Sequence, residues 1–223
     1  LTATVTDDGA GTLSDTAAIT ITVTDVNEAP VYNDAARSIN ENVAADTNVG
    51  APVTGTDPDA GQSLAYSITA GNAGGAFAIN PTTGQITTAA AINFETTPSY
   101  SLTVRATDNG SPVLFDTATV AITVNDLNDA PVVNDQSFSI AEDAVNGASV
   151  GTVSASDQDT GQLLTYGLTG TGPFTIDPST GAITTTGPLD FDTTPSYMLT
   201  ATVTDDGAGT LSDTAAITIT VTD

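Results

Sequence analysis

A block of about one hundred residues occurs twice in this chain, and this repeat limits the fold more than any other feature. DVNEAP at residues 25–30 returns as DLNDAP at residues 126–131, and INFETTPSY from Ile92 returns as LDFDTTPSY from Leu189. The first 25 residues are identical to residues 199–223. Because about one hundred residues is a common domain size, each block predicts one domain. We therefore expect a truncated C-terminal strand pair of a preceding repeat at 1–25, repeat 1 at 26–126 and repeat 2 at 127–223.

Apolar and hydroxyl residues alternate strictly at Ile19–Thr24, and Ala121–Val124 and Ile217–Val221 follow the same pattern. A period of two marks a half-buried antiparallel strand, and no stretch has the helical period. Each repeat contains seven such short segments separated by turn signals, which predicts all-β, tandem seven-stranded Greek-key β-sandwiches. The expected strands lie near 37–40, 49–56, 64–69, 77–79, 85–88, 100–107 and 117–125, and near 137–141, 150–156, 164–169, 174–176, 182–185, 197–204 and 214–222.

Turn and core residues also recur at matching places. NPTTG at 80–84 and DPSTG at 177–181 each predict a tight hairpin closed by a left-handed glycine. An isolated two-stranded hairpin is marginal in water, so Leu1–Val23 is expected to be poorly anchored or to exchange onto a neighbouring molecule. The aromatic residues expected to fill the two cores are Phe77, Phe94, Tyr100, Phe174, Phe191 and Tyr197.

The composition excludes several classes of function. The net charge is -25, and the only cations are Arg37 and Arg105, so no basic patch exists for nucleic acid or an anionic membrane surface. No apolar run is long enough for direct membrane insertion. The absence of Cys, His and Lys removes most nucleophiles and general bases, so we do not expect an enzyme. An apolar content of 39% with regular alternation still supports a folded core.

The carboxylates recur in step with the repeat. Asp57 and Asp59 in DPD return in DQD, Glu41 in NEN returns in AED, and Asp108 in TDN returns in TDD. Hard cations such as calcium take about six to eight oxygen ligands from carboxylates, amide side chains and carbonyl groups. The alternative is that these acids are solubilising turn residues, since Asp and Asn favour turns. Their fixed order across two copies favours ligands.

Together the motifs NEN, FE, DLNDAP, DQD and TDD resemble the inter-repeat calcium motifs of cadherin domains, in the Thr-rich form seen in large bacterial surface proteins. This resemblance covers the whole chain and implies a cadherin/immunoglobulin-like fold with Ca2+ at the junctions between repeats. It implies that the junction between repeats 1 and 2 takes its ligands from Glu41, Glu95, Asp126, Asn128, Asp129, Asp157, Asp159 and Asp205.

The sequence departs from the family pattern at two residues of this junction. Asn93 stands where the family has an aspartate, which weakens the outermost metal position, and Ala130 replaces the second linker asparagine. At the far end of repeat 2, Glu142, Asp190, Asp192 and Asp223 have no downstream partner. The first linker has only part of its set, because the upstream glutamates lie outside the chain. Its expected ligands are Asp25, Asn27, Glu28, Asp57, Asp59 and Asp108.

These observations predict a calcium-stiffened stalk or adhesion region of a secreted or cell-surface protein, extracellular and bacterial. Like charges at about 4 Å repel by roughly 4 kcal/mol per pair at an effective dielectric constant near 20, so a junction without cations is expected to splay. The alternative function is a carbohydrate-binding or homophilic module, in which the repeats bind surface polysaccharide or identical repeats on neighbouring molecules. The regular threonine rows leave an ice-binding surface as a further alternative, although threonine is ordinary on the outer face of a strand.

Overall fold

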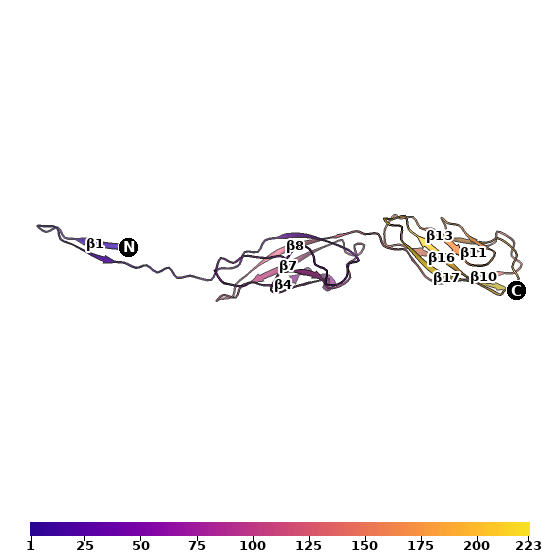
Figure 1. The fold of residues 1–223 in the computed structure, drawn as a ribbon, viewed down its shortest axis with the longest axis horizontal. Coiled ribbons are helices and arrows are strands. Elements are labelled where there is room, and N and C mark those ends of the chain that lie inside the picture. The colour runs from indigo at the N-terminus through magenta and orange to yellow at the C-terminus, as the bar shows by residue number, and fades with distance from the viewer.

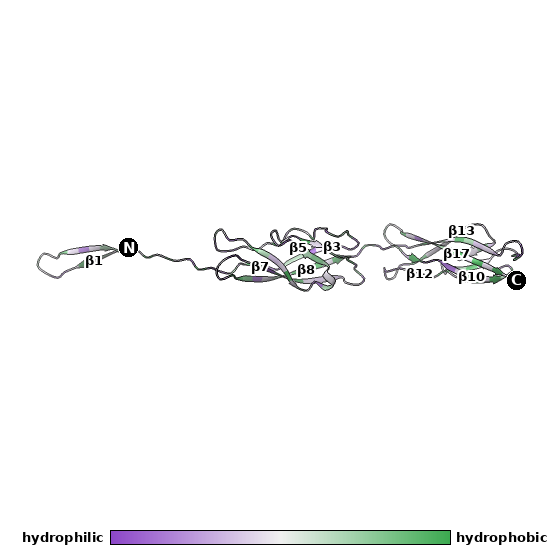
Figure 2. Cartoon of the chain, turned by 90° about the horizontal axis from the view of Figure 1, so that it is seen from below, coloured by the Kyte–Doolittle hydropathy of each residue, from purple (hydrophilic) through white to green (hydrophobic).

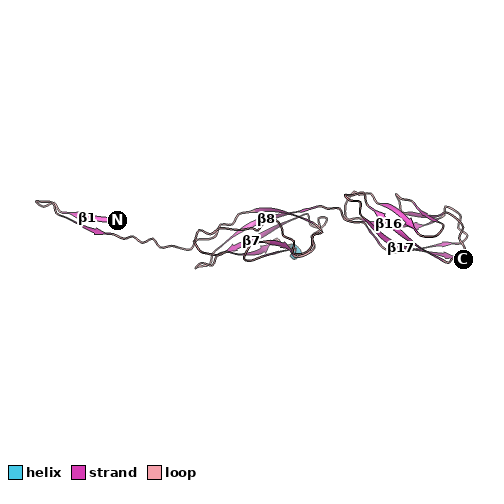
Figure 3. Ribbon diagram, viewed as in Figure 1, coloured by secondary structure: helices cyan, strands magenta, loops and turns pink.

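The computed structural model describes residues 1–223 as an elongated all-β molecule with two sandwiches arranged end to end (Figure 1). The chain has no α-helix, and its one helical turn is the short η1 (Ala73–Gly75) (Figure 3). No helix is long and apolar enough to cross a membrane. The all-β fold expected from the alternating sequence is therefore confirmed.

Repeat 1 is built around a four-stranded sheet with the order β3-β8-β7-β4 and a two-stranded sheet of β5 and β6. The strands are β3 (Ala35–Asn40), β4 (Ala65–Ala70), β5 (Phe77–Ile79), β6 (Ile86–Thr88), β7 (Ser99–Thr107) and β8 (Phe115–Asn125). The predicted strand at 49–56 does not form a regular ladder. It is held by the isolated bridges Asn48↔Thr87 and Val31↔Thr56 and by single backbone hydrogen bonds from Val49 and Val53.

Repeat 2 has the equivalent sheet with the order β10-β17-β16-β13, a three-stranded sheet β11-β15-β14 and the short pair β12-β9. The predicted strand at 150–156 is divided into two short strands, β11 and β12. The bounds are β9 (Val132–Val133), β10 (Gln136–Ala141), β11 (Ser149–Thr152), β12 (Ala155–Ser156), β13 (Thr165–Thr169), β14 (Phe174–Ile176), β15 (Ala182–Thr185), β16 (Ser196–Thr204) and β17 (Ser212–Thr222).

The last strand of each repeat has two different neighbours. β8 pairs antiparallel with β7 and parallel with β3, and β17 pairs antiparallel with β16 and parallel with β10. The expectation of purely antiparallel pairing is therefore wrong on one edge of these strands. The alternation of β17 follows the expected pattern, because Ala215, Ile217, Ile219 and Val221 are buried while the threonines between them are more exposed. Figure 2 shows the hydropathy of the residues along these strands.

Each sandwich has its own apolar core, with 16 buried residues in repeat 1 and 12 in repeat 2. Phe77 packs edge-on against Tyr100, with ring centroids 4.9 Å apart, and Phe174 packs on Tyr197 at 5.1 Å. Phe191 departs from its expected core position, since its side chain is 37% exposed. The equivalent Phe94 lies at the junction with repeat 2, whereas Phe191 lies at the opposite end of repeat 2, away from that junction.

The two predicted hairpin turns form as expected. Asn80 accepts backbone hydrogen bonds from Thr82 and Thr83 and leads to Gly84, which has a φ of 70°. A side chain at this glycine would place Cβ 2.1 Å from the carbonyl oxygen of Val53, so only glycine fits.

The first 25 residues form the hairpin β1 (Thr2–Thr6) and β2 (Ser14–Ala18), and every residue from 1 to 26 is exposed. The predicted strand at Ile19–Thr24 does not form. In the identical segment at residues 217–222, the backbone pairs with residues 196–199 and with β10. Ile19 still exchanges backbone hydrogen bonds with Leu1, but residues 20–24 have neither partner, so they run extended in solvent (Figure 1).

Candidate metal centre at the repeat junctions

Carboxylate and amide side chains from both repeats meet around the linker that contains Asp126 and Asp129. Glu41, at the end of β3, is fully buried, and its two oxygens accept backbone hydrogen bonds from Phe94 and Leu127, both 2.7 Å long. This residue therefore ties the linker to repeat 1. Carboxylate oxygens of Glu41, Glu95 and Asp126 lie within 4.8 Å of one another, which forms one acidic group from the predicted set.

Repeat 2 supplies the other half of this junction. The Asp129 amide donates to Asp159 Oδ2 at 2.7 Å, and the Asp159 amide donates to Asp157 Oδ1 at 2.9 Å. Asn128 Nδ2 donates to Asp205 Oδ2 at 3.1 Å. The structure thus brings all eight residues predicted for this junction into one connected region between the sandwiches.

Asp205 is held in place by the loop before β17. Its Oδ1 accepts hydrogen bonds from the amides of Gly207 and Leu211, both 3.0 Å long, and the residue is only 4% exposed. Asn128 passes directly over Gly207, where an added Cβ would lie 1.8 Å from Asn128 Oδ1. The glycine in TDDG therefore leaves room for the linker asparagine.

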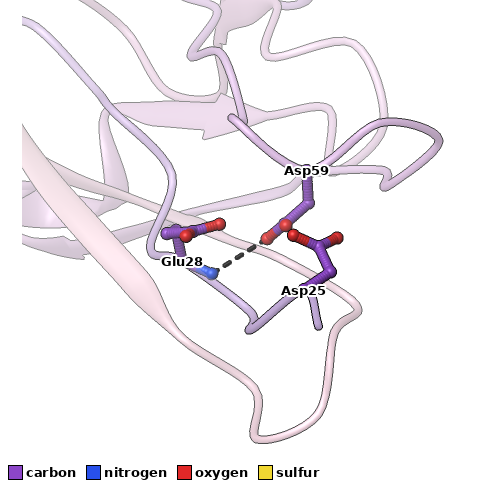
Figure 4. Close-up of side chains that lie close together, drawn as sticks. All are labelled: Asp25, Glu28 and Asp59. Carbon is purple, nitrogen blue, oxygen red and sulfur yellow. Dashed lines mark hydrogen bonds between the residues drawn. The ribbon is translucent and has the colours of Figure 1, made fainter. Parts of the chain in front are cut away.

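The same network recurs at the first linker. The Glu28 amide donates to Asp59 Oδ2 at 2.9 Å, and Asn27 Nδ2 donates to Asp108 Oδ2 at 3.0 Å. The carboxylates of Asp25, Glu28 and Asp59 converge, with oxygens within 4.8 Å of one another (Figure 4). With Asp57 hydrogen-bonded to the Asp59 amide, all six residues predicted for the first linker lie at this site.

Two glutamines belong to these sites, and the initial reading of the sequence missed them. Gln162 Nε2 donates to Asn128 Oδ1 at 2.6 Å, and Gln62 makes the same bond to Asn27. Their signal is present in the sequence, because DPDAGQ at 57–62 returns as DQDTGQ at 157–162. Asn42, Asn93 and Gln158 are also part of the second junction, but they have no matching copy in the other repeat.

Several oxygen atoms at these junctions are buried without a hydrogen-bond partner. Asp157 Oδ2, Glu95 Oε2 and Gln162 Oε1 are in this state at the second junction, and Asp57 Oδ2 and Gln62 Oε1 at the first. Burying such an oxygen unpaired is unfavourable unless a positive group faces it. All five atoms are oxygens of the kind that calcium prefers, so the donor set fits this ion.

The electrostatic effect of this crowding is visible in the carboxyl groups. Partial burial, together with Glu41, Asp129 and Asp126, raises the pKa of Glu95. Partial burial and the charges of Asp159, Glu41 and Asp129 raise the pKa of Asp126. At the first linker, a hydrogen bond with Asp59 and the Asp59 charge raise the pKa of Glu28.

Neither arginine neutralises these acids. Arg37 donates to the carbonyl groups of Ala36 and Ala51, and the guanidinium of Arg105 lies 5.2 Å from the centre of the Phe115 ring. A cavity of about 440 Å³ remains at the second junction, lined by Phe94, Glu95, Pro98, Asp126, Gln158, Asp159, Thr160 and Gln162. Residues of both repeats face this space, so a bound cation would contact both sandwiches.

The fold and the site define a class: tandem β-sandwich repeats with an acidic junction at each linker. Residues 36–125 and residues 136–222 each match the family described as Cadherin domain. These two matches cover more than half of the chain, which therefore belongs to the cadherin domain family.

Individual relatives agree with this assignment. The chain is 41% identical over 236 residues to the Protocadherin-like wing polarity protein stan of Drosophila melanogaster, covering 97% of the chain and 6% of the relative. The crystal structure of the Protocadherin GammaB4 extracellular domain has a TM-score of 0.69 and 34% identity, covering 100% of this chain and 37% of that one. The Protocadherin gammaB7 EC3-6 cis-dimer structure has a TM-score of 0.61 and 30% identity, covering 98% and 59%.

The chain thus spans a small part of the curated relatives it matches. Those relatives include fly, human, mouse and rat proteins, so they do not support the bacterial context expected from the Thr-rich motifs. The relatives are cadherins and protocadherins, which are not enzymes, in agreement with the expected lack of catalytic activity.

Proposed function

We propose that this chain is a calcium-stiffened region of an extracellular cell-surface protein that takes part in calcium-dependent adhesion. The unpartnered buried oxygens of Asp157 and Glu95 at the junction carry this proposal, because they require a positive partner that the chain does not supply. Calcium would be held by Glu41, Glu95, Asp126, Asn128, Asp129, Asp157, Asp159 and Asp205. It would supply positive charge that offsets the repulsion between these groups and links the two repeats.

The first linker is proposed as a second, incomplete site of the same kind. Asp25, Asn27, Glu28, Asp57, Asp59 and Asp108 supply carboxylates from the linker and repeat 1 only. The second junction has donors from both flanking repeats, and Glu41 there is fully buried. We therefore assign the higher calcium affinity to the second junction, within the range of about 0.1–1 mM typical of extracellular modules.

Calorimetric titration with calcium tests the proposal. Asp157→Asn keeps an oxygen for the Asp159 amide but removes the charge, so it should weaken binding at the second junction about tenfold or more, which corresponds to about 1.4 kcal/mol. Asp46→Asn is the matched control, because Asp46 is exposed and has a φ of 64°, which asparagine tolerates. Equal calcium affinity of both variants and the unmodified chain would refute the proposed site.

Association between identical repeats is a second candidate function. It is supported by the similarity to a protocadherin fragment whose structure is described as a cis-dimer. Analytical ultracentrifugation with and without calcium tests this candidate, and a monomer at every concentration would argue against it.

Polysaccharide binding is the remaining alternative, and little in the structure supports it. The exposed ring of Phe115 has the Arg105 guanidinium 5.2 Å from its centre, which occupies one of the faces on which a sugar could stack. A glycan array in calcium would separate this function from self-association.

A further inference from the structure

One edge of the second junction contains amide side chains in place of acids. Asn93 from repeat 1 donates through Nδ2 to Gln158 Oε1 of repeat 2 at 2.9 Å. Gln158 Nε2 in turn donates to Asp129 Oδ2 at 3.3 Å. We call Asn93, Gln158 and Asp129, together with Asn42, the amide bridge. Its members come from repeat 1, repeat 2 and the linker, so it joins the sandwiches through direct hydrogen bonds.

Asp129 is the centre of this bridge. Asn42 Nδ2 donates to Asp129 Oδ1 at 2.6 Å, while Gln158 reaches the other oxygen. Each oxygen of this carboxylate therefore has an amide donor, one from each repeat. Hydrogen bonds to an ionised acceptor are stronger than neutral ones, and they need no cation.

Asn93 uses its amide nitrogen for the contact with Gln158 and its amide oxygen for a second, local contact. Its Oδ1 accepts a hydrogen bond from the Thr96 amide at 2.8 Å and caps the local turn. Asp190 is the equivalent residue in repeat 2 and makes the same cap to Thr193 at 3.1 Å. An aspartate therefore supports the turn equally well, and the amide at position 93 is needed only for the contact with Gln158.

The other copy of the repeat shows that these amides are not required by the fold. Asp143 occupies the place of Asn42, and Pro58 occupies the place of Gln158. The hydrogen bond inside the DxD loop is nevertheless 2.9 Å long in both copies. The end of repeat 1 has two carboxylates and two amides, Glu41, Asn42, Asn93 and Glu95, where repeat 2 has four carboxylates, Glu142, Asp143, Asp190 and Asp192.

We propose that the amide bridge connects repeats 1 and 2 without a metal ion at this edge, so that the junction binds one divalent cation fewer than it would with aspartate at position 93. Asn42 and Asn93 stand where the other copy has aspartates, so they remove charges that would repel the nearby acids. Asn42 and Gln158 add donors for Asp129. The cation count rests on the proposed calcium site, whereas the direct contact between the repeats does not.

The contact is tested by the distance between the repeats in EDTA. The chain has no cysteine, so Ser101→Cys in repeat 1 and Ser179→Cys in repeat 2, both exposed positions, can be spin-labelled specifically. In EDTA we expect a narrower distance distribution for the unmodified junction than for Gln158→Ala and Asn93→Asp, because only the unmodified junction keeps these hydrogen bonds. Asn48→Asp adds the same charge at an exposed position outside the bridge and should leave the width of the distribution unchanged. Equal widths in all four proteins would overturn the bridge.

The cation count is tested by calcium calorimetry on the same variants. Asn93→Asp should bind one more calcium ion per chain than the unmodified protein, and Asn48→Asp should bind the same number. An unchanged count for Asn93→Asp would overturn the statement about cation number. A chain that binds no calcium at all would instead refute the proposed function, and the EDTA distances would still decide whether the bridge exists.

Discussion

At the scale of single residues, the close approach of Asn128 to Gly207 determines how the linker fits onto repeat 2. An alanine at position 207 would place its Cβ 1.8 Å from Asn128 Oδ1, so the asparagine must move and its bond to Asp205 is lost. We expect Gly207→Ala to destabilise repeat 2 by about 1–3 kcal/mol, as overpacking usually does, and to weaken calcium binding. Thermal unfolding and calorimetry measure the two effects.

Gly167→Ala is the matched control for this change. A Cβ at position 167 would have only the carbonyl oxygen of Thr202 nearby, at 3.9 Å, which is an ordinary contact. The control should keep its calcium affinity. If Gly207→Ala bound calcium as tightly as this control, the position of Asn128 would not matter for the site.

Asp213 provides a pH-dependent contact outside the metal centres. Hydrogen bonds from the backbone amides of Val133 and Thr214 lower the pKa of Asp213. A carboxyl group with a lowered folded pKa stabilises the protein above its unfolded pKa, near 3.9, and this contribution is lost as the pH falls through the folded value.

Because the pKa of Asp213 is lowered in the folded protein, its contribution to stability should differ between neutral and acidic pH. Asp213→Asn should lower the unfolding midpoint of repeat 2 at pH 7, because the charged acceptor is lost. The difference from the unmodified protein should shrink at a pH below the ordinary carboxyl range, where the aspartate is protonated too. Chemical unfolding at both pH values measures this, and a difference that stays constant would show that the charge of Asp213 is not involved.

At the scale of elements, much of the sheet structure could be predicted from alternation alone. The long strands β7, β8, β16 and β17 agree with their predicted positions to within two residues at each end. The segment at 49–56 was overpredicted, because its buried residues Val49 and Val53 are held by single backbone hydrogen bonds to Ile86 and Gly84 and not by a continuous ladder. Strand length depends on hydrogen-bond partners far away in the sequence, and a local pattern does not contain this information.

The candidate site shows the same division between local and distant information. Its carboxylates could be predicted, because they recur in fixed order in both copies. Asn93 and Gln158 could not, since each differs from its counterpart and its role depends on a contact between residues 65 positions apart. Recurrence therefore found the acidic residues that the two junctions share, but it missed the residues specific to one junction.

Two identical segments in different surroundings test whether strand formation depends on distant hydrogen-bond partners. Residues 19–24 have the same sequence as residues 217–222, but only the second copy lies within a sheet. We expect the amides of 20–24 to exchange with solvent at nearly the rate of an unfolded chain, while those of β17 within the sheet are protected.

Hydrogen exchange followed by NMR distinguishes the two identical stretches. Val26 directly follows residues 1–25 and Met198 directly precedes residues 199–223, so sequential assignment can start from these residues. The equal sequence serves as an internal control for intrinsic exchange rates. Equal protection of both copies would mean that residues 20–24 pair with another strand in solution.

At the scale of the whole molecule, the separate cores make the junction the main determinant of shape. Repeats 1 and 2 have independent apolar clusters, and the contacts between them are polar and acidic. With a net charge of -25 and raised pKa values at Glu95 and Asp126, the repeats repel each other across the linker at neutral pH. Direct bonds such as the amide bridge oppose this repulsion, and a bound cation would oppose it more strongly.

The balance between these effects predicts how the shape responds to calcium. Small-angle X-ray scattering should give a larger maximum dimension in calcium than in EDTA. Calcium is expected to fix the angle between the two repeats, so that they point along one axis. An Asp157→Asn, Asp159→Asn double variant should give the EDTA-like curve in both buffers, whereas Asp46→Asn should respond as the unmodified chain does. Since ionic strength alone also screens repulsion, the EDTA sample is matched in ionic strength with sodium chloride. An equal maximum dimension in both buffers would show that calcium does not stiffen this junction.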